Sequence, residues 1–397
     1  MKSNSASENF ASQSHRDDEH PLQNGWRAVE RFFFTPTEPT TLGLMRIVTG
    51  IIVLYVHISY SIGLDNYIGP DAWIMNHGLT ERPQPGEEGV IDFLRHGNPQ
   101  ESPSTNWSDN PFENANGKIF KGATMWSIYF HVEDRFWIRV IHYTIMLIMI
   151  LFTLGLWTRV MSVLTWIGAL MYIQRVPGML FGMDTMTNLG LFYLMFAPCG
   201  AALSVDRWLK VRRERQRQGA AYVPLPPEPL ISATFVTRAL QINYCLIYLA
   251  AGTSKLLGSS WWNATAPNRF LLNYSFAPFD VEYYERLLKF MADHRWVWEL
   301  NGTFGVVFTL FVELGFPFMV WNRSTRWFMV RGSILLHTAI ALLMGLVTFS
   351  LMMLALVLVF VPPDCVRLTL QAWGDWLYQL LLGRHNSPQS QSVALSR

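Results

Sequence analysis

The sequence predicts an all-α polytopic membrane protein, and composition and apolar patterning support this class. Half of the 397 residues are hydrophobic and only 15% are charged, whereas a soluble domain usually carries about 25% charged residues. Several apolar stretches also approach the roughly 20 residues that a helix needs to cross a bilayer. Because every backbone polar group in lipid must find a partner within its own segment, such stretches can cross only as helices.

We expect about eight transmembrane helices in this chain. The connections around the third span and between the last two spans are short, so one of these segments could instead be re-entrant. The predicted spans cover residues 42–62, 137–157, 160–174, 184–205, 236–257, 303–321, 327–345 and 346–361.

Arginine and lysine in the short connections predict the orientation. The segment 206–218, DRWLKVRRERQRQ, carries six of them, and the turn after the sixth span carries Arg323, Arg326 and Arg331. Short cytoplasmic loops are enriched in these residues, so we assign both connections, together with Arg159, to the cytoplasm. Both termini are then cytoplasmic, and the segments 63–136 and 258–302 form external loops.

The two ends of the chain are predicted to lie outside the bilayer core. Residues 1–25 are polar and lack the apolar centre of a signal peptide, which favours a disordered cytoplasmic leader. The transmembrane domain then covers residues 26–365. Residues 366–384 place leucines and tryptophans along one helical face, which predicts an amphipathic helix at the membrane interface. Residues 385–397 form a disordered tail.

Composition also bears on partners and cofactors. The net charge of +2 carries no signal for nucleic acid, and we expect no such partner. The three cysteines are far apart and lack Cys-x-x-Cys spacing, so neither a disulfide framework nor a thiolate metal site is expected. No pair of histidines in the spans has the spacing of a four-helix cytochrome, and we expect no haem.

Lys255 is the most unusual residue of the predicted spans. It lies in an otherwise apolar run, CLIYLAAGTSKLLGSSWW, at 245–262. With a rise of about 1.5 Å per residue it sits about one turn below the outer boundary, so its ammonium can snorkel to the headgroups. Alternatively, it occupies a mostly apolar pocket, where desolvation favours a neutral amine able to act as a base or nucleophile.

Other polar side chains lie within the spans, where they usually face the protein interior. Glu313 and His337 are near the middle of the sixth and seventh spans. Their pattern predicts either a Glu–His hydrogen bond between helices or a role in proton transfer or ligand binding. His57 and Tyr60 of the first span and His142 of the second fall in the outer halves, which predicts that they share a layer with Lys255.

Several motifs resemble a known family when taken together. These are Phe-x-Pro in FFTP near the start, Ser-x-Asp-Arg in SVDR at 204–207, and YLAAGTSKLLGSSW at 248–261. Most of residues 26–365 resemble the horizontally transferred transmembrane (HTTM) domain. This domain is the bacterial branch related to vitamin K-dependent gamma-carboxylase.

The resemblance implies a multi-pass enzyme, here of the bacterial inner (cytoplasmic) membrane, with lyase and oxidoreductase chemistry. The carboxylase oxidises a reduced quinone of the vitamin K type with oxygen and uses the strong base so formed to carboxylate glutamyl side chains. Its catalytic base is a lysine in a run similar to residues 248–261, which implies that role for Lys255 and a vitamin K or menaquinol-type cofactor. Trp261, Trp262 and Phe276 would then wall the pocket.

Two departures from the family limit this expectation. The carboxylase has a histidine near the start of a helix comparable to the fourth span, where this chain has DTMTN at 184–188. Asp184 and Asn188 are therefore the pocket candidates at that place. The carboxylase also has a large lumenal domain for its protein substrate, so we expect quinol oxidation rather than protein carboxylation.

Two other classes of function remain open. One is a non-catalytic accessory protein for the maturation of a secreted peptide, which needs the external loops but no reactive lysine. The other is a small-solute transporter with Glu313 and His337 as a proton relay, although the sequence lacks the inverted repeats common in transporters.

Overall fold

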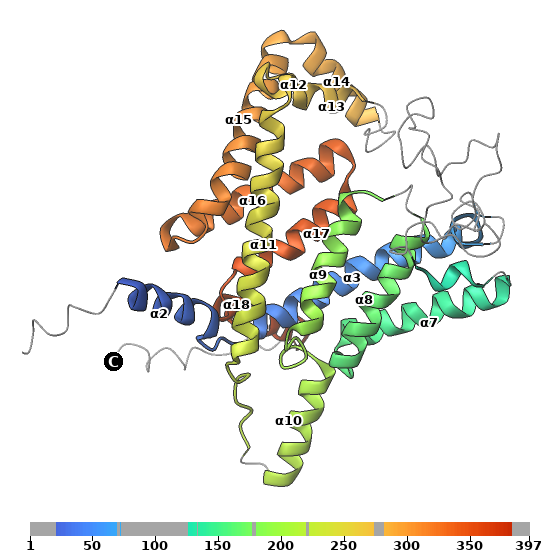
Figure 1. The fold of residues 1–397 in the computed structure, drawn as a ribbon, viewed down its shortest axis with the longest axis vertical. Coiled ribbons are helices and arrows are strands. Elements are labelled where there is room, and N and C mark those ends of the chain that lie inside the picture. Colours follow the sequence, from blue (N-terminus) through green and yellow to red (C-terminus); the bar gives the residue numbers. More distant parts are fainter. Residues whose placement is uncertain are drawn as a thin grey trace, which may run out of the picture.

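A computed structural model describes residues 21–69, 72, 126–132, 134–176, 180–219, 222–273 and 282–382. Within these ranges the regular elements are helices, and Thr37 and Leu230 form an isolated β-bridge. The all-α class is confirmed for this part of the chain (Figure 1). The helices are α2 (Pro21–Phe34), α3 (Thr40–Ile62), α4 (Leu64–Tyr67), η3 (Ile128–Phe130), α7 (Arg135–Leu154), α8 (Thr158–Arg175), α9 (Gly182–Phe196), α10 (Val205–Gln218), α11 (Ile231–Leu256), α12 (Ser259–Trp262), α13 (Ala266–Leu272), α14 (Glu282–Asp293), α15 (Arg295–Met319), α16 (Arg323–Met344), α17 (Val347–Val357), η6 (Leu358–Phe360) and α18 (Pro363–Leu382).

The bundle has two parts that share α17. In one part α3 packs on α7, α7 on α8, and α8 on α9. In the other part α11 packs on α15, and α15 on α16. Helix α17 contacts α16 on one side and both α3 and α9 on the other, so it joins the two parts (Figure 1).

Apolar helices long enough to cross a bilayer confirm the prediction of a membrane protein. Among the described residues four helices qualify by length and composition, namely α3, α7, α15 and α16. The pair α17–η6 and α18, bent by 112°, makes up to a fifth. Helix α9 has 15 residues and α17 has 11. At about 1.5 Å per residue both are shorter than a bilayer core of about 30 Å. The count of eight spans and the cytoplasmic location of the termini stay predictions.

The fourth predicted span, 184–205, is too long. Helix α9 ends at Phe196, and Ala197 has an extended backbone with φ −76° and ψ 145°. Pro198 explains this end, because the ring of a proline disfavours the helical conformation of the residue before it. Buried Arg46 then fixes the following turn by donating from Nη1 to the carbonyl of Cys199 at 2.7 Å and from Nη2 to that of Leu203 at 2.5 Å.

The segments expected outside the span region contain more helix than predicted. Helix α2 begins at Pro21, inside the leader expected at 1–25, whereas residues 1–20 lie outside the described ranges. Much of the segment 258–302, expected as a loop, is helical in α12, α13, α14 and the first turns of α15. Most of the segment 63–136 and the tail 385–397 also lie outside the described ranges.

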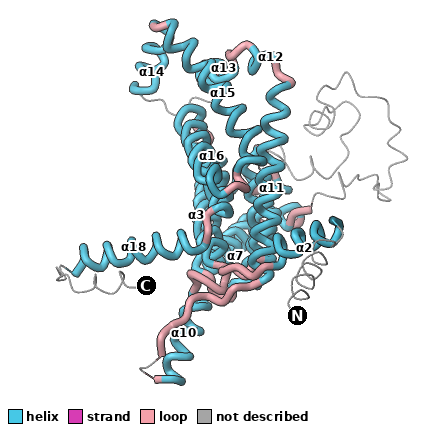
Figure 2. Tube along the Cα trace, turned by 90° about the vertical axis from the view of Figure 1, so that its left-hand side faces the viewer, coloured by secondary structure: helices cyan, strands magenta, loops and turns pink. Residues whose placement is uncertain are grey.

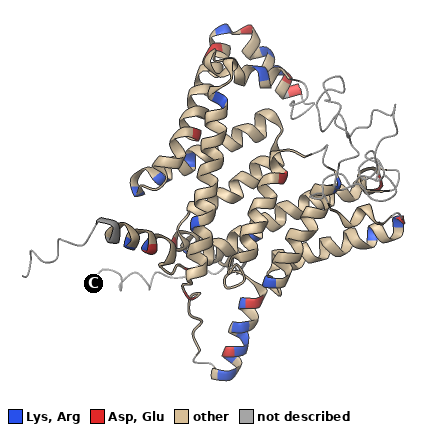
Figure 3. Ribbon diagram, in the orientation of Figure 1, with Lys and Arg blue, Asp and Glu red and all other residues tan. Residues whose placement is uncertain are grey.

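Charge is distributed unevenly over the bundle. Lys and Arg are frequent on α10, which extends beyond the lower end of the bundle, whereas most of the central helices carry few charges (Figure 3). Helix α18 leaves the bundle at a steep angle and projects sideways (Figure 2). Its tryptophans and several of its leucines are exposed, in keeping with the interfacial helix predicted at 366–384.

Candidate functional site

Buried polar side chains gather in two clusters, one in each part of the bundle. The lysine–glutamate cluster consists of Tyr244, Tyr248 and Lys255 on α11, Glu313 on α15, and Ser333 and His337 on α16. The tyrosine–histidine cluster consists of His57 and Ser61 on α3, Tyr129 on η3, His142 on α7 and Tyr172 on α8.

Lys255 forms an ion pair with Glu313, and a glycine makes the pairing possible. The Nζ–Oε1 distance is 2.8 Å, and the side chains are 24% and 9% exposed. Gly252 lies one helical turn before the lysine, and a Cβ there would come within 2.7 Å of Leu314 Cδ2 and 3.2 Å of Glu313 Cβ. The missing side chain therefore lets α11 approach α15 closely. As a result, Nζ of Lys255 reaches across to the neighbouring helix.

Of the tryptophans predicted to wall a pocket, only one lies over the lysine. Nζ of Lys255 is 5.4 Å from the ring centroid of Trp261, within the range of a cation–π contact. Trp262 is 71% exposed and donates from Nε1 to the carbonyl of Leu256. Trp262 as a wall of the site therefore stays a prediction, and Phe276 lies outside the described residues.

Glu313 and His337 do not form the predicted hydrogen bond with each other. Nε2 of His337 is 2.8 Å from the hydroxyl of Tyr248, which is in turn 2.8 Å from the hydroxyl of Ser333. Tyr244 joins the same serine at 2.9 Å. Hydroxyl groups thus link α11 to α16. The carboxylate of Glu313 instead accepts from Lys255.

Two buried polar atoms of this cluster have no hydrogen-bond partner among the described residues. They are Oε2 of Glu313 and Nδ1 of His337. Buried polar atoms are nearly always hydrogen-bonded in folded proteins, and an exception often marks a bound molecule or a catalytic group. The lysine–glutamate cluster therefore combines a charged pair with spare hydrogen-bonding capacity.

The tyrosine–histidine cluster is a continuous chain of hydrogen bonds. Tyr129 donates to the hydroxyl of Tyr172 at 2.8 Å, and that hydroxyl lies 2.5 Å from Nδ1 of His142. Ser61 donates to the carbonyl of His57, and its Oγ lies 2.7 Å from Nε2 of His142. A neutral His142 with its proton on Nε2 satisfies both of its contacts.

His57 leaves one ring nitrogen beside a small cavity. Nδ1 donates to the carbonyl of Val53 at 2.7 Å, because a carbonyl can only accept, and Nε2 has no partner among the described residues. The ring lines a cavity of about 20 Å³ together with Tyr60, Asp184 and Thr187. A cavity of this size has room for about one water molecule and not for a quinone.

Asp184 and Asn188 have structural partners on α8 and α9. Oδ2 of Asp184 accepts from the backbone N–H of Phe181 at 3.0 Å at the start of α9, and Oδ1 of Asn188 accepts from Nε1 of Trp166 on α8 at 2.7 Å. No hydrogen bond, ion pair or ring contact between described residues links His57, Tyr60, His142, Asp184 or Asn188 to Lys255. These residues therefore have partners in the other part of the bundle, and their sharing a layer with Lys255 stays a prediction.

Sequence reasoning did not select the hydroxyl groups of the lysine–glutamate cluster. Tyr244 and Tyr248 are four residues apart on α11, and Ser333 and His337 are four apart on α16. Residues with this spacing lie on the same face of a helix. The polar pair on each helix was therefore the sequence pattern that could have indicated a polar contact between α11 and α16.

Comparisons with known proteins do not extend these findings. No family model, no curated protein and no solved structure matches the chain. Within the described residues, no group of three or more His, Cys, Asp or Glu side chains is arranged to hold a metal ion.

Proposed function

We propose that the lysine–glutamate cluster binds a reduced quinone from the bilayer and takes a proton from its hydroxyl group. The observation that carries this proposal is the Lys255–Glu313 pair, 2.8 Å long, in which Oε2 of the carboxylate is buried without a partner among the described residues. A hydroxyl both donates and accepts. The pair offers an acceptor at Oε2 and further N–H donors at Nζ.

The surroundings also suit a flat, apolar molecule. The ring of Trp261 lies 5.4 Å from Nζ and supplies an aromatic wall, against which a naphthoquinol ring can stack. Lys255 keeps 24% of its side chain exposed, so a molecule that moves through the membrane can reach the amine. These features fit a lipid-soluble phenolic substrate better than a charged, water-soluble one.

The pair divides the acid–base work between two side chains. A bound quinol supplies the phenolic proton and the electrons, with molecular oxygen as the oxidant. Glu313 accepts the proton at Oε2, and the ammonium of Lys255 stabilises the negative charge that develops on the quinol oxygen. Lys255 can act as the base itself only after it has passed its own proton to Oε1.

The experiment measures oxidation of added menaquinol or vitamin K quinol by the purified protein in lipid nanodiscs. We expect Lys255→Ala and Glu313→Gln each to lower turnover by about 100-fold or more, the usual effect of losing an acid–base group. Glu299→Gln is the matched control, because it removes a carboxylate from an exposed ion pair with Arg295 on the same helix. Turnover should then be unchanged.

Two results would overturn the proposal. The first is absence of turnover in the unmodified, folded protein, which would favour the accessory role in peptide maturation. The second is full turnover by both variants of the pair.

A further inference from the structure

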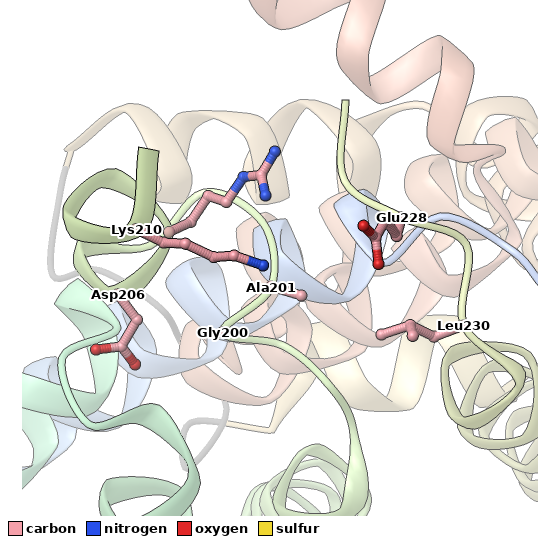
Figure 4. Close-up of a pocket in the computed structure, with 7 residues that line it drawn as sticks. Gly200, Ala201, Asp206, Lys210, Glu228 and Leu230 are labelled. Atoms are coloured by element: carbon pink, nitrogen blue, oxygen red, sulfur yellow. The ribbon is translucent and has the colours of Figure 1, made fainter. Parts of the chain in front are cut away.

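We infer that a pocket at the lower end of the bundle binds the headgroup of a zwitterionic phospholipid with a primary ammonium group, the chemistry of phosphatidylethanolamine. The pocket has a volume of about 260 Å³ and lies between the turn after α9, the start of α10 and the segment that leads into α11. Gly200, Ala201, Asp206, Arg207, Lys210, Glu228 and Leu230 line it (Figure 4).

Two of the four charged residues in the pocket are already used by the fold. Oδ1 of Asp206 accepts from the backbone N–H of Trp157 at 2.9 Å, and Oδ2 accepts from the backbone N–H and the hydroxyl of Thr158 at 2.9 and 2.7 Å. Arg207 donates from Nη2 to the carbonyl of Leu225 at 2.5 Å. Both side chains therefore hold the walls of the pocket in place.

The other two charged residues, Lys210 and Glu228, are available to a ligand. Neither has an ion pair or side-chain hydrogen bond within the part of the chain that the structure describes. The amine of Lys210 points toward Ala201, and Glu228 lies on the opposite wall (Figure 4). Among the described residues the pocket thus presents one cation and one anion without ion-pair partners on opposite walls, and these are the charges that a phosphate and an ammonium bind.

The wall between them is fixed before any ligand binds. Buried Arg46 on α3 holds the carbonyls of Cys199 and Leu203 on either side of Gly200 and Ala201. A preorganised wall lowers the entropic cost of binding.

The rim of the pocket favours a lipid over a soluble ligand. Trp208 and Ile231 directly follow the lining residues Arg207 and Leu230, and Leu203 lies two residues after Ala201. These three side chains are 55%, 51% and 38% exposed. Exposed apolar side chains next to a tryptophan are typical of the membrane interface, and α10 carries the Lys and Arg residues that predict a cytoplasmic location for this end. Acyl chains can therefore lie along the rim while the headgroup occupies the pocket.

The charge pattern selects among phospholipids. An anionic headgroup leaves Glu228 without a partner and adds a like charge near it. A choline headgroup carries no N–H to donate to that carboxylate. Of these three kinds of headgroup, only one with a primary ammonium can donate a hydrogen bond to Glu228 while its phosphate binds Lys210.

The experiment titrates delipidated protein in detergent with short-chain phosphatidylethanolamine, phosphatidylcholine and phosphatidylglycerol, and with free phosphoethanolamine, and measures binding by native mass spectrometry. We expect phosphatidylethanolamine to bind at least about tenfold more tightly than phosphatidylcholine, as for one charge-assisted hydrogen bond. Glu228→Gln should abolish that preference, whereas Lys210→Met should weaken all phosphate-bearing ligands. Arg213→Gln, an exposed change on the same helix, is the control and should leave binding unchanged.

Equal binding of phosphatidylethanolamine and phosphatidylcholine would overturn the inference, and so would a preference that survives Glu228→Gln. Free phosphoethanolamine binding as tightly as the lipid would overturn the assignment to a membrane lipid. Thermal unfolding of each variant shows that a loss of binding is not a loss of folding.

Discussion

The two buried clusters use similar side chains but differ in what they leave unsatisfied. The tyrosine–histidine cluster has no ion pair among the described residues, and its hydrogen bonds connect Tyr129 with the carbonyl of His57. Nε2 of His57 has no described partner, and the His57 ring lines a cavity of about 20 Å³. The lysine–glutamate cluster holds a charged pair and two polar atoms without described partners. The first arrangement ties helices together, and the second retains capacity for a ligand.

Energetics support this difference. A neutral, fully connected hydrogen-bond network inside a protein is stabilising and specifies one packing. A buried ion pair often contributes little net stability, because desolvation of both charges offsets their attraction. A contribution to stability therefore explains the presence of Lys255 and Glu313 less well than the presence of Tyr172 and His142.

The largest expected effect comes from breaking the ion pair on one side only. Glu313→Gln leaves the ammonium of Lys255 without its carboxylate, and losing one partner of a buried pair costs about 3 kcal/mol. The double variant Glu313→Gln with Lys255→Met removes both charges and should recover most of that loss. Chemical unfolding in detergent measures both. A double variant as unstable as the single one would show that the pair is a structural tie like the other cluster.

The next effect tests the tyrosine–histidine cluster in the same way. Tyr172→Phe removes the acceptor for Tyr129 and the hydrogen-bond partner of Nδ1 of His142, which should cost about 2 kcal/mol. Tyr129→Phe removes only the terminal donor and should cost about 1 kcal/mol. Because this cluster has no part in the proposed chemistry, quinol turnover should be unchanged in both. A loss of turnover with normal unfolding would contradict the division of roles.

A smaller effect concerns the approach of α11 to α15. Gly252→Ala places a Cβ 2.7 Å from a side-chain carbon of Leu314. Overpacking of this kind costs about 1 kcal/mol or more, and it also separates Lys255 from Glu313, so turnover should fall with stability. Gly374→Ala on α18 is the control, because nothing lies within 4 Å of its Cβ, and there alanine should stabilise the helix slightly. Unchanged stability of Gly252→Ala would show that Leu314 gives way without cost.

The sequence allowed the helices and the charged residues of the site to be predicted, but not their pairing. Apolar length gives the position of a helix, and Pro198 could have given the end of α9. Lys255 and Glu313 stand out because charges are rare in such runs. Their contact depends on how α11 and α15 are rotated and on the space at Gly252, which no single helix encodes. The hydroxyl groups of Tyr248 and Ser333 gave no signal alone, since such residues are common in packed helices.

The smallest expected effect concerns Asp206 on α10, a carboxylate whose two oxygens both accept hydrogen bonds from the protein. It contrasts with Glu313, which has one oxygen without a described partner. Burial raises the pKa of Asp206, but the hydrogen bonds from Thr158 and Trp157, with the nearby charge of Arg46, outweigh it and hold this pKa below its ordinary value. A depressed folded pKa means that Asp206 contributes stability above its unfolded pKa of about 3.9. That contribution is lost as the pH falls through the folded pKa.

We therefore expect Asp206→Asn to lower the melting temperature at pH 7 and to differ less from the unmodified protein at about pH 3. Thermal unfolding in detergent at the two pH values measures this, and a difference that stays constant would contradict it. Unlike Glu313, Asp206 has no carboxylate oxygen without a partner, because Oδ1 accepts from Trp157 and Oδ2 accepts from Thr158. Its replacement should therefore change stability while leaving quinol turnover intact, which separates a carboxylate that holds the fold from one that awaits a substrate.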